Sequence, residues 1–523
     1  MTVSDKNRHG GTSMSNTVNH IQITYFSGYI RNWQKLCGEL SIALPLSREE
    51  REEAILKNAF IKWGTELPQH LFGMFAVALY DENAKKHYMF RDPVGQKQMF
   101  YTTAGGELVC SGDIDAVVAG IEKRLNTRML QQYLFYGYPI GTETFYENVF
   151  KMPAGHFAEW DGRSLTLHRY FMPLFEPDTG KTVDEWADEI ARVVEEICAE
   201  EKADTELPYK ESFLSGGVDS SYLLAASDAV CANTVGYDEE GFDESSPARR
   251  TAEIVGKGFR VKHISPEEYF ERIPTVIDKM GQPLGDASAV AFSLGCQAVG
   301  EFAKVVYSGE GIDEFFGGYN AHKREIPKEW TYLTCSHIMN NEVVKSLLRG
   351  YDDTLSAEEP VRALWEATEG QEPLARKLTV DISLWLEGDI YLNTDRTSTA
   401  CGIELHTPFS DVRLFNVAKK IPASYEFMEG QNKYVFRKAA AKLLPEEVAF
   451  RKKVGFPVPV RKWLADERFN KPVADVLFGA TSQKFFRQEE LRDWWTRFLG
   501  GEALFWNRIY AVYVFLLWYD LKF

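Results

Sequence analysis

The chain has 523 residues and a formal net charge of −17 at pH 7. Its length predicts at least two domains, because one hydrophobic core rarely serves more than about 250–300 residues. The acidic balance argues against nucleic-acid binding, which needs clustered lysine and arginine side chains. No apolar run is long enough to span a membrane. The seven scattered cysteines form no CxxC pair, which favours reduced thiols in the cytoplasm over disulfides or a zinc site.

The first third of the chain predicts a polar tail followed by a β-rich domain. Residues 1–20 are polar and lack an apolar signal core, so we expect a disordered tail. Residues 21–172 carry strand and turn patterns. Two strand-like runs, 74–80 and 87–90, flank the polar turn DENAKK and predict a hairpin. Helices are expected near residues 46–63 and 127–136.

The remainder of the chain predicts a second domain over residues 183–523. A stretch with proline and glycine, residues 173–182, is the expected linker. Strand and helix patterns then alternate, which predicts a parallel sheet with helices on both faces. From about residue 320 the patterns are mostly helical. The aromatic-rich segment 506–523 is expected to pack in the core and not against a membrane.

One turn in this second domain has the form of a phosphate-binding loop. The segment SFLSGGVDSS, residues 212–221, predicts a short strand, a glycine turn and a helix. Such a turn gathers backbone N–H groups at the start of a helix, where they attract phosphate. The alternative is that the glycines merely reverse the chain, which is common for a single short motif.

A second glycine turn lowers the weight of that alternative. VVYSGEGIDEFFGGY, residues 305–319, again places serine, glycines and an acidic residue after a strand. Ligands of open α/β sheets bind beyond the carboxyl ends of the strands. We therefore expect Asp219 and Asp313 to point to one place, where two carboxylates beside a polyphosphate suit Mg²⁺.

Positive charge comes from a later segment. Residues 431–459 are dense in lysine and arginine within an acidic chain. A solvated basic helix would explain the composition. Against this, KKVGFPVP is a loop with restricted backbone, and a lysine there could stabilise negative charge that develops during nucleotidyl transfer.

These motifs together resemble the asparagine synthetase B family, with its relatives the β-lactam and carbapenam synthetases and the lasso-peptide cyclases. The resemblance extends from about residue 22 to the end. LSGGVDSS is similar to the pyrophosphate loop of that family, and SGEGIDEFFGGY to its second metal-binding loop. NTDRTSTACGIELHTPFSDVRL resembles the stretch leading to a Pro-Phe-Leu-Asp element, with Ser410 where leucine is usual. KYVFRKA and LPEEVAFRKKVGF resemble its C-terminal lysine segment.

The resemblance implies an α/β fold. It consists of a degenerate N-terminal Ntn-hydrolase-like α/β/β/α sandwich and a C-terminal synthetase domain of the ATP-pyrophosphatase type. This second domain has a parallel sheet and a helical C-terminal part. The implied chemistry uses ATP and Mg²⁺: a carboxylate attacks the α-phosphorus of ATP to give an acyl-adenylate, and an amine then displaces AMP.

The same resemblance assigns residues to roles, motif by motif. Asp219 and Asp313 would bind Mg²⁺, Lys433 would pair with phosphate, and Lys453 would stabilise charge in both transition states. The residues expected around the pyrophosphate and adenosine are Leu214, Ser215, Gly216, Gly217, Ser220, Val235, Ser308 and Gly309.

Glu310 is expected at the acyl-transfer site. The corresponding residue of this loop is acidic in asparagine synthetases and typically tyrosine in β-lactam-forming relatives. Glu310 therefore resembles the asparagine synthetase version and could accept a proton from the incoming amine. Alternatively, Glu310 only caps the following turn. Glu404 also matches a recurrent glutamate of the family, but a structural ion pair would explain it equally well.

The N-terminal domain departs from the family. Glutamine-hydrolysing members carry a cysteine directly after the initiator methionine, whereas residue 2 here is threonine and the first cysteine is Cys37. Ser27 and Tyr29 also replace the usual asparagine and glutamate of a later segment. We therefore expect a domain without glutaminase activity, kept for packing or for a partner.

The sequence thus predicts an AMP-forming carbon–nitrogen ligase that joins a small carboxylic acid to ammonia or an amine. The sequence is also compatible with a peptide substrate and with a homo-oligomer. Neither nucleic acid nor a membrane is an expected partner. The alternatives are a ring-closing synthetase of the β-lactam or lasso-peptide type and a non-catalytic scaffold.

Overall fold

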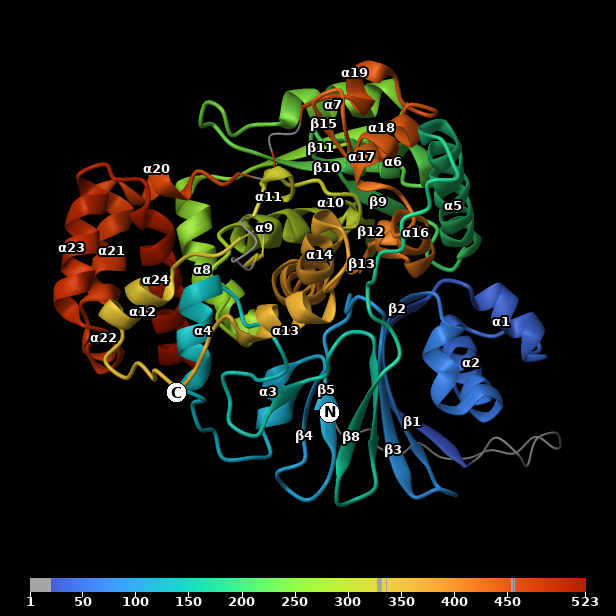
Figure 1. Ribbon diagram of the computed structural model, residues 1–523, viewed down its shortest axis with the longest axis horizontal. Coiled ribbons are helices and arrows are strands. Elements are labelled where there is room, and N and C mark those ends of the chain that lie inside the picture. The colour runs from blue at the N-terminus through green and yellow to red at the C-terminus, as the bar shows by residue number, and fades with distance from the viewer. Residues whose placement is uncertain (1–19, 327–331, 335, 453–454, 456) are drawn as a thin grey trace.

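The structure, a computed structural model, describes residues 20–326, 332–334, 336–452, 455 and 457–523. All but one residue of the predicted disordered tail, residues 1–20, lie outside this range. The β-rich N-terminal part stands below the C-terminal part in Figure 1, and the last helices form a bundle at one side.

Two antiparallel sheets face each other in the N-terminal part, with strand orders β1-β2-β3-β7-β8 and β5-β4-β6. Side chains alternate along the central strand: Phe75, Val77 and Leu79 pack against the helical layer, while Ala76 and Ala78 face the second sheet. The strands are β1 (Ile21–Ile30), β2 (Gly73–Asp81), β3 (Lys86–Arg91), β4 (Phe100–Thr102), β5 (Val109–Ser111), β6 (Phe150–Lys151), β7 (His156–Trp160) and β8 (Leu165–Arg169). The helices are α1 (Trp33–Glu39), α2 (Arg48–Trp63), η1 (Gly64–Gln69), α3 (Ile114–Val118) and α4 (Arg128–Tyr136).

The expected hairpin is confirmed. Strands β2 and β3 pair antiparallel with Leu79 opposite Tyr88. The helix expected near residues 46–63 is α2, which begins where Ser47 and Glu50 form a capping box.

The C-terminal part contains a parallel sheet in the order β11-β10-β9-β12-β13, as expected. Helices α6 and α7 belong to one apolar cluster and α8 and α9 to another, so both faces of the sheet are covered. The strands are β9 (Lys210–Phe213), β10 (Cys231–Gly236), β11 (Gly258–His263), β12 (Val305–Tyr307) and β13 (Glu404–His406). The helices up to β12 are α5 (Val183–Ala203), α6 (Val218–Ala226), α7 (Ser245–Ile254), α8 (Pro266–Met280) and α9 (Ser288–Gly300). β13 was not expected, because the sequence after residue 320 was interpreted as mostly helical.

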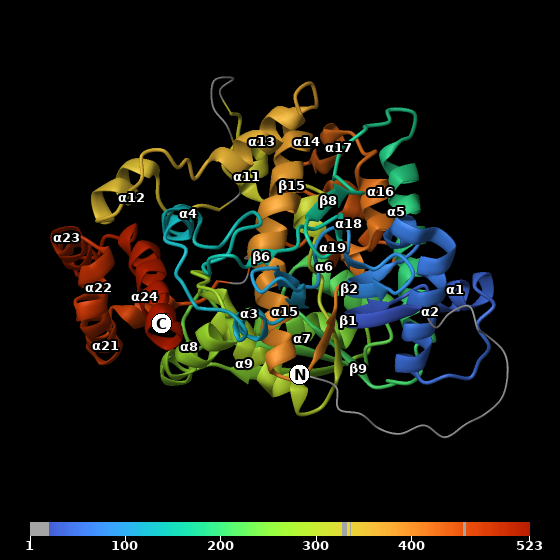
Figure 2. The same ribbon diagram turned by 90° about the horizontal axis from the view of Figure 1, so that it is seen from below.

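One long helical column crosses the middle of the molecule and is seen along its length in Figure 2. It consists of α14 (Pro373–Val380), the π-helical segment η2 (Asp381–Ile390) and α15 (Tyr391–Ala400). The remaining elements are α10 (Ile312–Phe315), α11 (Asn320–Lys323), α12 (Asn341–Leu347), α13 (Glu359–Ala367), η3 (Pro408–Ser410), α16 (Val412–Ala418), α17 (Ala423–Glu426), β14 (Phe427–Met428), β15 (Gln431–Asn432), α18 (Tyr434–Ala440), α19 (Glu446–Ala449), α20 (Val460–Leu464), α21 (Glu467–Leu477), α22 (Ala480–Phe485), α23 (Gln488–Leu499) and α24 (Phe505–Lys522).

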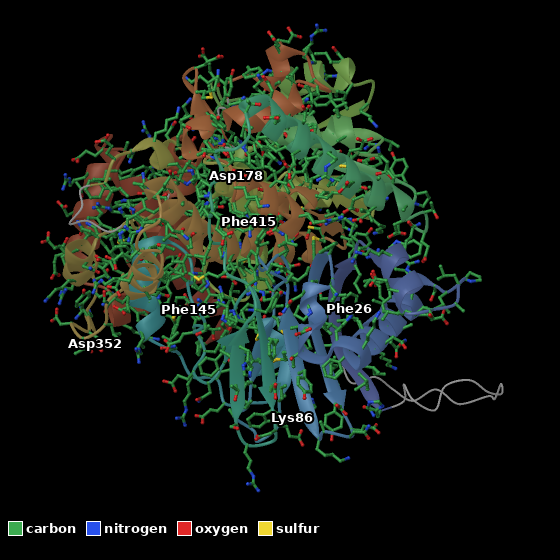
Figure 3. All side chains as sticks on the ribbon, turned by 45° about the vertical axis from the view of Figure 1, so that its right-hand side comes forward. Phe26, Lys86, Phe145, Asp178, Asp352 and Phe415 are labelled. Carbon is green, nitrogen blue, oxygen red and sulfur yellow. The ribbon has the colours of Figure 1, made fainter. Side chains whose placement is uncertain are left out.

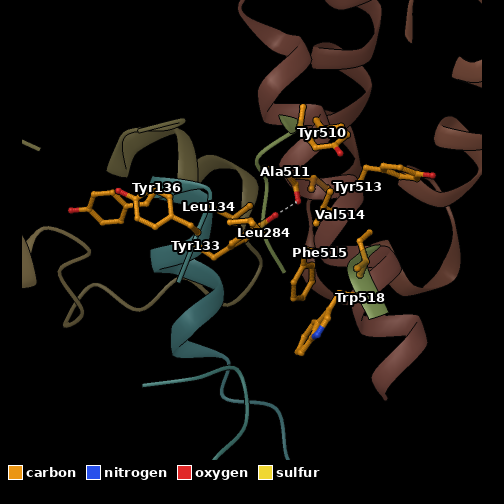
Figure 4. Packing of buried hydrophobic residues seen from close by; sticks show 14 of the residues in the cluster. Tyr133, Leu134, Tyr136, Leu284, Tyr510, Ala511, Tyr513, Val514, Phe515 and Trp518 are labelled. Carbon is orange, nitrogen blue, oxygen red and sulfur yellow. Dashed lines mark hydrogen bonds between the residues drawn. The ribbon is translucent and has the colours of Figure 1, made fainter. Parts of the chain in front are cut away.

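The two parts share an apolar core. Residues of α3 and α4 belong to the same buried cluster as residues of α8, α9 and α24. Figure 4 shows α4 against α24, where the hydroxyl of Tyr133 donates a hydrogen bond of 2.9 Å to the carbonyl of Ala511. The expectation that the last helix packs in the core is confirmed. Among the described residues, no helix has the length and apolar character needed to cross a membrane.

Aromatic packing also joins the segment after β8 to the C-terminal part. Phe415, labelled near the centre of Figure 3, contacts Phe171 and Phe175 edge-on, with ring centroids 5.5 and 5.4 Å apart. The N-terminal part is therefore tied into the molecule by packing at several places.

A buried ionic network also connects the two parts. Arg31, which follows β1, donates to Glu201 of α5 at 2.7 Å and pairs with Asp411. His406 of β13 contacts Glu201 at 2.8 Å and Glu404 at 2.6 Å. Each of these charges has a partner of opposite sign, which offsets the cost of burial.

His406 gives this network a pH dependence. Burial lowers the pKa of His406, but the carboxylates of Glu201 and Glu404 outweigh burial and raise it to about 9. A histidine whose pKa is higher in the folded than in the unfolded state stabilises the fold fully below about pH 6.5. That contribution is lost as the pH rises through about 9.

We therefore expect the thermal unfolding midpoint of the wild type to fall between pH 6.5 and 9 more steeply than that of His406→Gln. Differential scanning calorimetry at a series of pH values measures both slopes. Equal slopes in the two proteins would show that His406 is not charged in the folded state.

Candidate active site

Two glycine-bearing loops meet where the strand order of the parallel sheet reverses. Residues 214–217 follow β9 and residues 308–311 follow β12, and these two strands are neighbours. The connection from β9 leads to β10 on one side of this strand pair, and the connection from β12 leads to β13 on the other side, which opens a crevice at the carboxyl ends of the strands. A Cβ added to Gly309 would lie 3.1 Å from the backbone nitrogen of Ser220, so the loops are in close contact.

Hydroxyl groups hold the first loop in shape. The backbone N–H of Ser215 donates to Oγ of Ser220 at 3.0 Å, and the N–H of Gly217 donates to Oγ of Ser215 at 3.2 Å. Oγ of Ser221 donates to the carbonyl of Gly217 at 2.7 Å. The serines thus bond to the loop that starts α6.

The two aspartates of these loops converge on one lysine. Nζ of Lys433 lies 2.8 and 2.7 Å from the two carboxylate oxygens of Asp219, and 2.7 Å from Oδ1 of Asp313. Lys433 is 1% exposed and has a positive φ of 54°. A positive φ is uncommon for a residue other than glycine, so the backbone is constrained to place this ammonium group between the carboxylates.

The arrangement of the two carboxylates fits a divalent cation that also binds phosphate. Asp219 and Asp313 supply two oxygen-donor groups at one point, and the phosphates of a nucleotide would supply further oxygens, as Mg²⁺ commonly requires. Among the described residues no group of three or more histidine, cysteine, aspartate or glutamate side chains could hold a metal without such help. The donor set therefore suits a metal that arrives with a nucleotide.

A cavity of about 730 Å³ opens in front of this trio. Its size is within the range of small-molecule sites. The sequence-predicted residues that line it are Leu214, Ser215, Asp219, Ser220, Val235, Ser308, Gly309, Glu310, Asp313 and Lys433. Gly216 and Gly217 do not line it. Lys453 lies outside the described residues, so its role stays a prediction.

Glu310 is held at the edge of this cavity by its own loop and by Ser410. The hydroxyl of Ser308 donates to Oε1 of Glu310 at 2.9 Å. Oγ of Ser410 donates to the carbonyl of Glu310 at 2.9 Å and accepts a hydrogen bond from the hydroxyl of Tyr391. The unusual serine of the PFSD segment thus bonds directly to the backbone of the predicted acyl-transfer residue.

The comparisons with known families agree with this geometry. The family model described as asparagine synthase matches residues 203–520, which include both loops and Lys433. A model described as a glutamine amidotransferase domain matches residues 1–171.

The chain belongs to the asparagine synthase family.

Relatives within this family align over most of its length. Asparagine synthetase (glutamine-hydrolyzing) 1 of Bacillus subtilis is 27% identical, over 95% of this chain and 85% of the relative. A putative asparagine synthetase (glutamine-hydrolyzing) of Mycobacterium bovis is 30% identical, over 84% and 76%. A solved NAD+ synthetase from Burkholderia pseudomallei overlaps 42% of this chain and 94% of its own, with 17% identity and a TM-score of 0.18. The family model and the two asparagine synthetase relatives show that the chain is an asparagine synthetase-like, ATP-dependent carbon–nitrogen ligase.

Two acidic residues were missed by the sequence analysis: Glu314, which lines the cavity, and Glu426, which does not line it but interacts electrostatically with Lys433. Glu314 accepts a hydrogen bond of 2.6 Å from the hydroxyl of Tyr319. Burial, and then the charge of Asp313, raise the pKa of Glu314 to about 8. Glu426 is 3% exposed, and burial raises its pKa although the charge of Lys433 opposes the rise. The adjacency of Glu314 to Asp313 was a usable signal, whereas nothing in the segment around Glu426 indicates a site.

Glu404 belongs to the ionic network and does not line the cavity. It pairs with Arg48 at the start of α2 and with His406. Of the two explanations left open by the sequence, the ion pair is the one present in the structure.

A substitution at Gly318 tests how strongly the candidate site depends on the position of Asp313. A Cβ at Gly318 would lie 1.7 Å from Oδ1 of Asp313, so Gly318→Ala must displace the carboxylate. Misplacing a reacting group by about 1 Å can cost about 10²-fold in rate. We expect Gly318→Ala to slow pyrophosphate release from ATP by about that factor. The control is Gly350→Ala, because no atom lies within 4 Å of a Cβ added there. Equal rates for both variants would contradict the placement.

Proposed function

We propose that the chain activates a substrate carboxylate as an acyl-adenylate and transfers the acyl group to ammonia or an amine, without hydrolysing glutamine. The observation that carries this proposal is the convergence of Asp219, Asp313 and Lys433 beside the cavity at the strand-order reversal. Such a cluster suits the binding of a nucleoside triphosphate with its metal ion.

In the first step, a carboxylate oxygen of the substrate attacks the α-phosphorus of ATP. A bond forms between that oxygen and phosphorus, and the bond to the bridging oxygen breaks, so pyrophosphate leaves. Asp219 and Asp313 would hold Mg²⁺, which would neutralise negative charge on the phosphates. The loop of Ser215 and Ser220 would orient the pyrophosphate, and Lys433 would turn its ammonium group to phosphate oxygens.

In the second step, Glu310 accepts a proton from the incoming amine. The nitrogen lone pair attacks the acyl carbon, a C–N bond forms, and the C–O bond to AMP breaks. Glu310 supports this role because it lines the cavity while Ser308 and Ser410 fix its side chain and backbone. A fixed carboxylate is an effective general base.

We infer that glutamine is not the nitrogen donor, because neither residues 1–36 nor Cys37 supplies a thiol suited to glutamine hydrolysis. Residues 1–36 contain no cysteine. Cys37 is 3% exposed within α1, and burial raises the pKa of its thiol. A buried thiol with a raised pKa is a poor nucleophile.

The test incubates the full chain with α-labelled ATP, Mg²⁺, L-aspartate and either ammonium chloride or glutamine. L-aspartate is the first acid to try, given the named function of the relatives. We expect AMP and pyrophosphate in equal amounts with ammonium, and no glutamate from glutamine. Cys37→Ala should behave like the wild type. Formation of ADP alone would contradict adenylation, and release of glutamate would contradict the loss of glutaminase activity.

A further inference from the structure

A second cavity of about 690 Å³ adjoins the first. Phe242, Ser288 and Pro457 line both. The long helical column forms part of both walls, since Ile390 and Asn393 line the first cavity while Trp385 and Asp389 line the second. A molecule in the second cavity would therefore lie beside the cavity that Glu310 lines.

The second cavity is lined by a buried carboxyl group, Asp389, one of whose oxygens makes no hydrogen bond with the described residues. Asp389 is 2% exposed, and its Oδ1 has no hydrogen-bond partner among the described residues. Asp286 lines the same cavity and accepts a hydrogen bond of 2.8 Å from the backbone N–H of Ser288. Burial raises the pKa of both carboxyl groups, and the charge of Asp286 adds to the rise at Asp389. A cationic ligand would relieve the cost of burying these two groups.

Aromatic side chains form much of the remaining wall. Tyr136, Tyr138, Trp385 and Trp506 line the cavity, and the rings of Tyr138 and Trp385 meet edge-on with centroids 5.3 Å apart. Aromatic faces bind apolar groups and also attract organic ammonium ions. The exposed side chains of Arg461 and Lys462 line the same cavity and could pair with an anionic group elsewhere on a ligand.

The size of the cavity separates two classes of nitrogen donor. Ammonia occupies about as much space as a water molecule, roughly 30 Å³. A cavity of 690 Å³ is suited to a ligand of many heavy atoms. An organic amine uses the carboxylates and the aromatic wall together, whereas ammonia would use only the carboxylates.

We propose that the second cavity binds the amine substrate that accepts the acyl group. The amine binds as an organic ammonium ion, with its charge at Asp389 and Asp286 and its apolar body against the aromatic rings. This inference rests on the proposed function, since only an acyl-transfer reaction needs an amine here. One proton of the ammonium group passes to Glu310, the C–N bond forms as AMP leaves, and the second proton goes to solvent.

Calorimetric titration of the full chain tests the inference with defined probes. The probes are 2-phenylethylamine and tryptamine, with 2-phenylethanol as the neutral counterpart of the first. We expect at least one amine to bind at least tenfold more tightly than 2-phenylethanol. Asp389→Asn should raise the Kd of the amine at least tenfold, because it removes the carboxylate charge with little change of shape. The Kd of Mg-ATP should stay within twofold of the wild-type value.

Two tryptophan variants keep the test decisive if Asp389→Asn does not fold. Trp506→Ala removes part of the aromatic wall, and Trp495→Ala removes a half-buried ring that packs on Phe478 outside the cavity. We expect weaker amine binding only in the first. The inference is overturned if no amine binds more tightly than the neutral probe, or if both tryptophan variants bind amines like the wild type. Wild-type protein that binds Mg-ATP but no amine disproves this inference alone, whereas protein that does not bind Mg-ATP disproves the proposed function.

Discussion

Asp313→Asn is expected to slow AMP formation by about 10³-fold, equivalent to ~4 kcal/mol of transition-state stabilisation. The reason is that Asp313 and Asp219 are the two carboxylates that meet at Lys433. Without one of them, the site keeps a single acidic group to hold a metal ion with the nucleotide. Pyrophosphate release in the presence of L-aspartate and ammonium measures the loss.

The matched control for this change is Asp188→Asn. Asp188 pairs with Lys442 near the surface, with the Asp188 side chain 67% exposed. The same chemical change there alters the net charge equally but touches no part of the site. Comparable rates of AMP formation in the two variants would show that Asp313 does not take part in the reaction. Circular dichroism of both variants separates lost chemistry from lost folding.

Arg31→Met is expected to lower the free energy of unfolding by about 3 kcal/mol, because Glu201 and Asp411 each lose one buried cation and keep only His406 and Arg413, respectively. Arg31 contacts Glu201 and Asp411, and the side chains of all three are at most 1% exposed. Urea denaturation followed by fluorescence measures the effect at the first transition, since a chain of this size need not unfold in one step.

Arg192→Met on helix α5 is the control for this second prediction. Arg192 pairs with Glu196 one turn later, and both side chains are more than half exposed. An exposed pair of this kind contributes at most about 1 kcal/mol. If the two substitutions destabilised the protein equally, the Arg31 network would not connect the two parts energetically.

Much of the candidate site could be predicted because its signals are local. The loops at Ser215 and Ser308 each combine a strand, a glycine turn and an acidic residue within about ten positions. Parallel strands then bring Asp219 and Asp313 together, because their carboxyl ends share one edge of the sheet. The hairpin of β2 and β3 was predictable for the same reason, since its alternation and its turn are adjacent in sequence.

What could not be predicted depends on contacts between distant segments. β13 has only three residues, Glu404–His406, and forms a strand because it pairs with β12 about a hundred positions earlier. The π-helical segment η2 lies within a helical pattern of period 3.6 that does not reveal it. Glu426 interacts with Lys433 of the candidate site only because the fold brings its buried side chain within electrostatic reach. The second cavity likewise assembles from widely separated segments, among them Tyr136, Asp286, Asp389 and Trp506.

The packing of α4 against α24 affects how this protein is made on the ribosome. Tyr133 and its hydrogen-bond partner Ala511 are 378 positions apart. At synthesis rates of 5–20 residues per second, about 20–75 s separate their emergence. During that interval the apolar face of α4 is translated but has no α24 to cover it. Nascent chains of this enzyme should therefore depend on chaperones that shield such a face until translation ends.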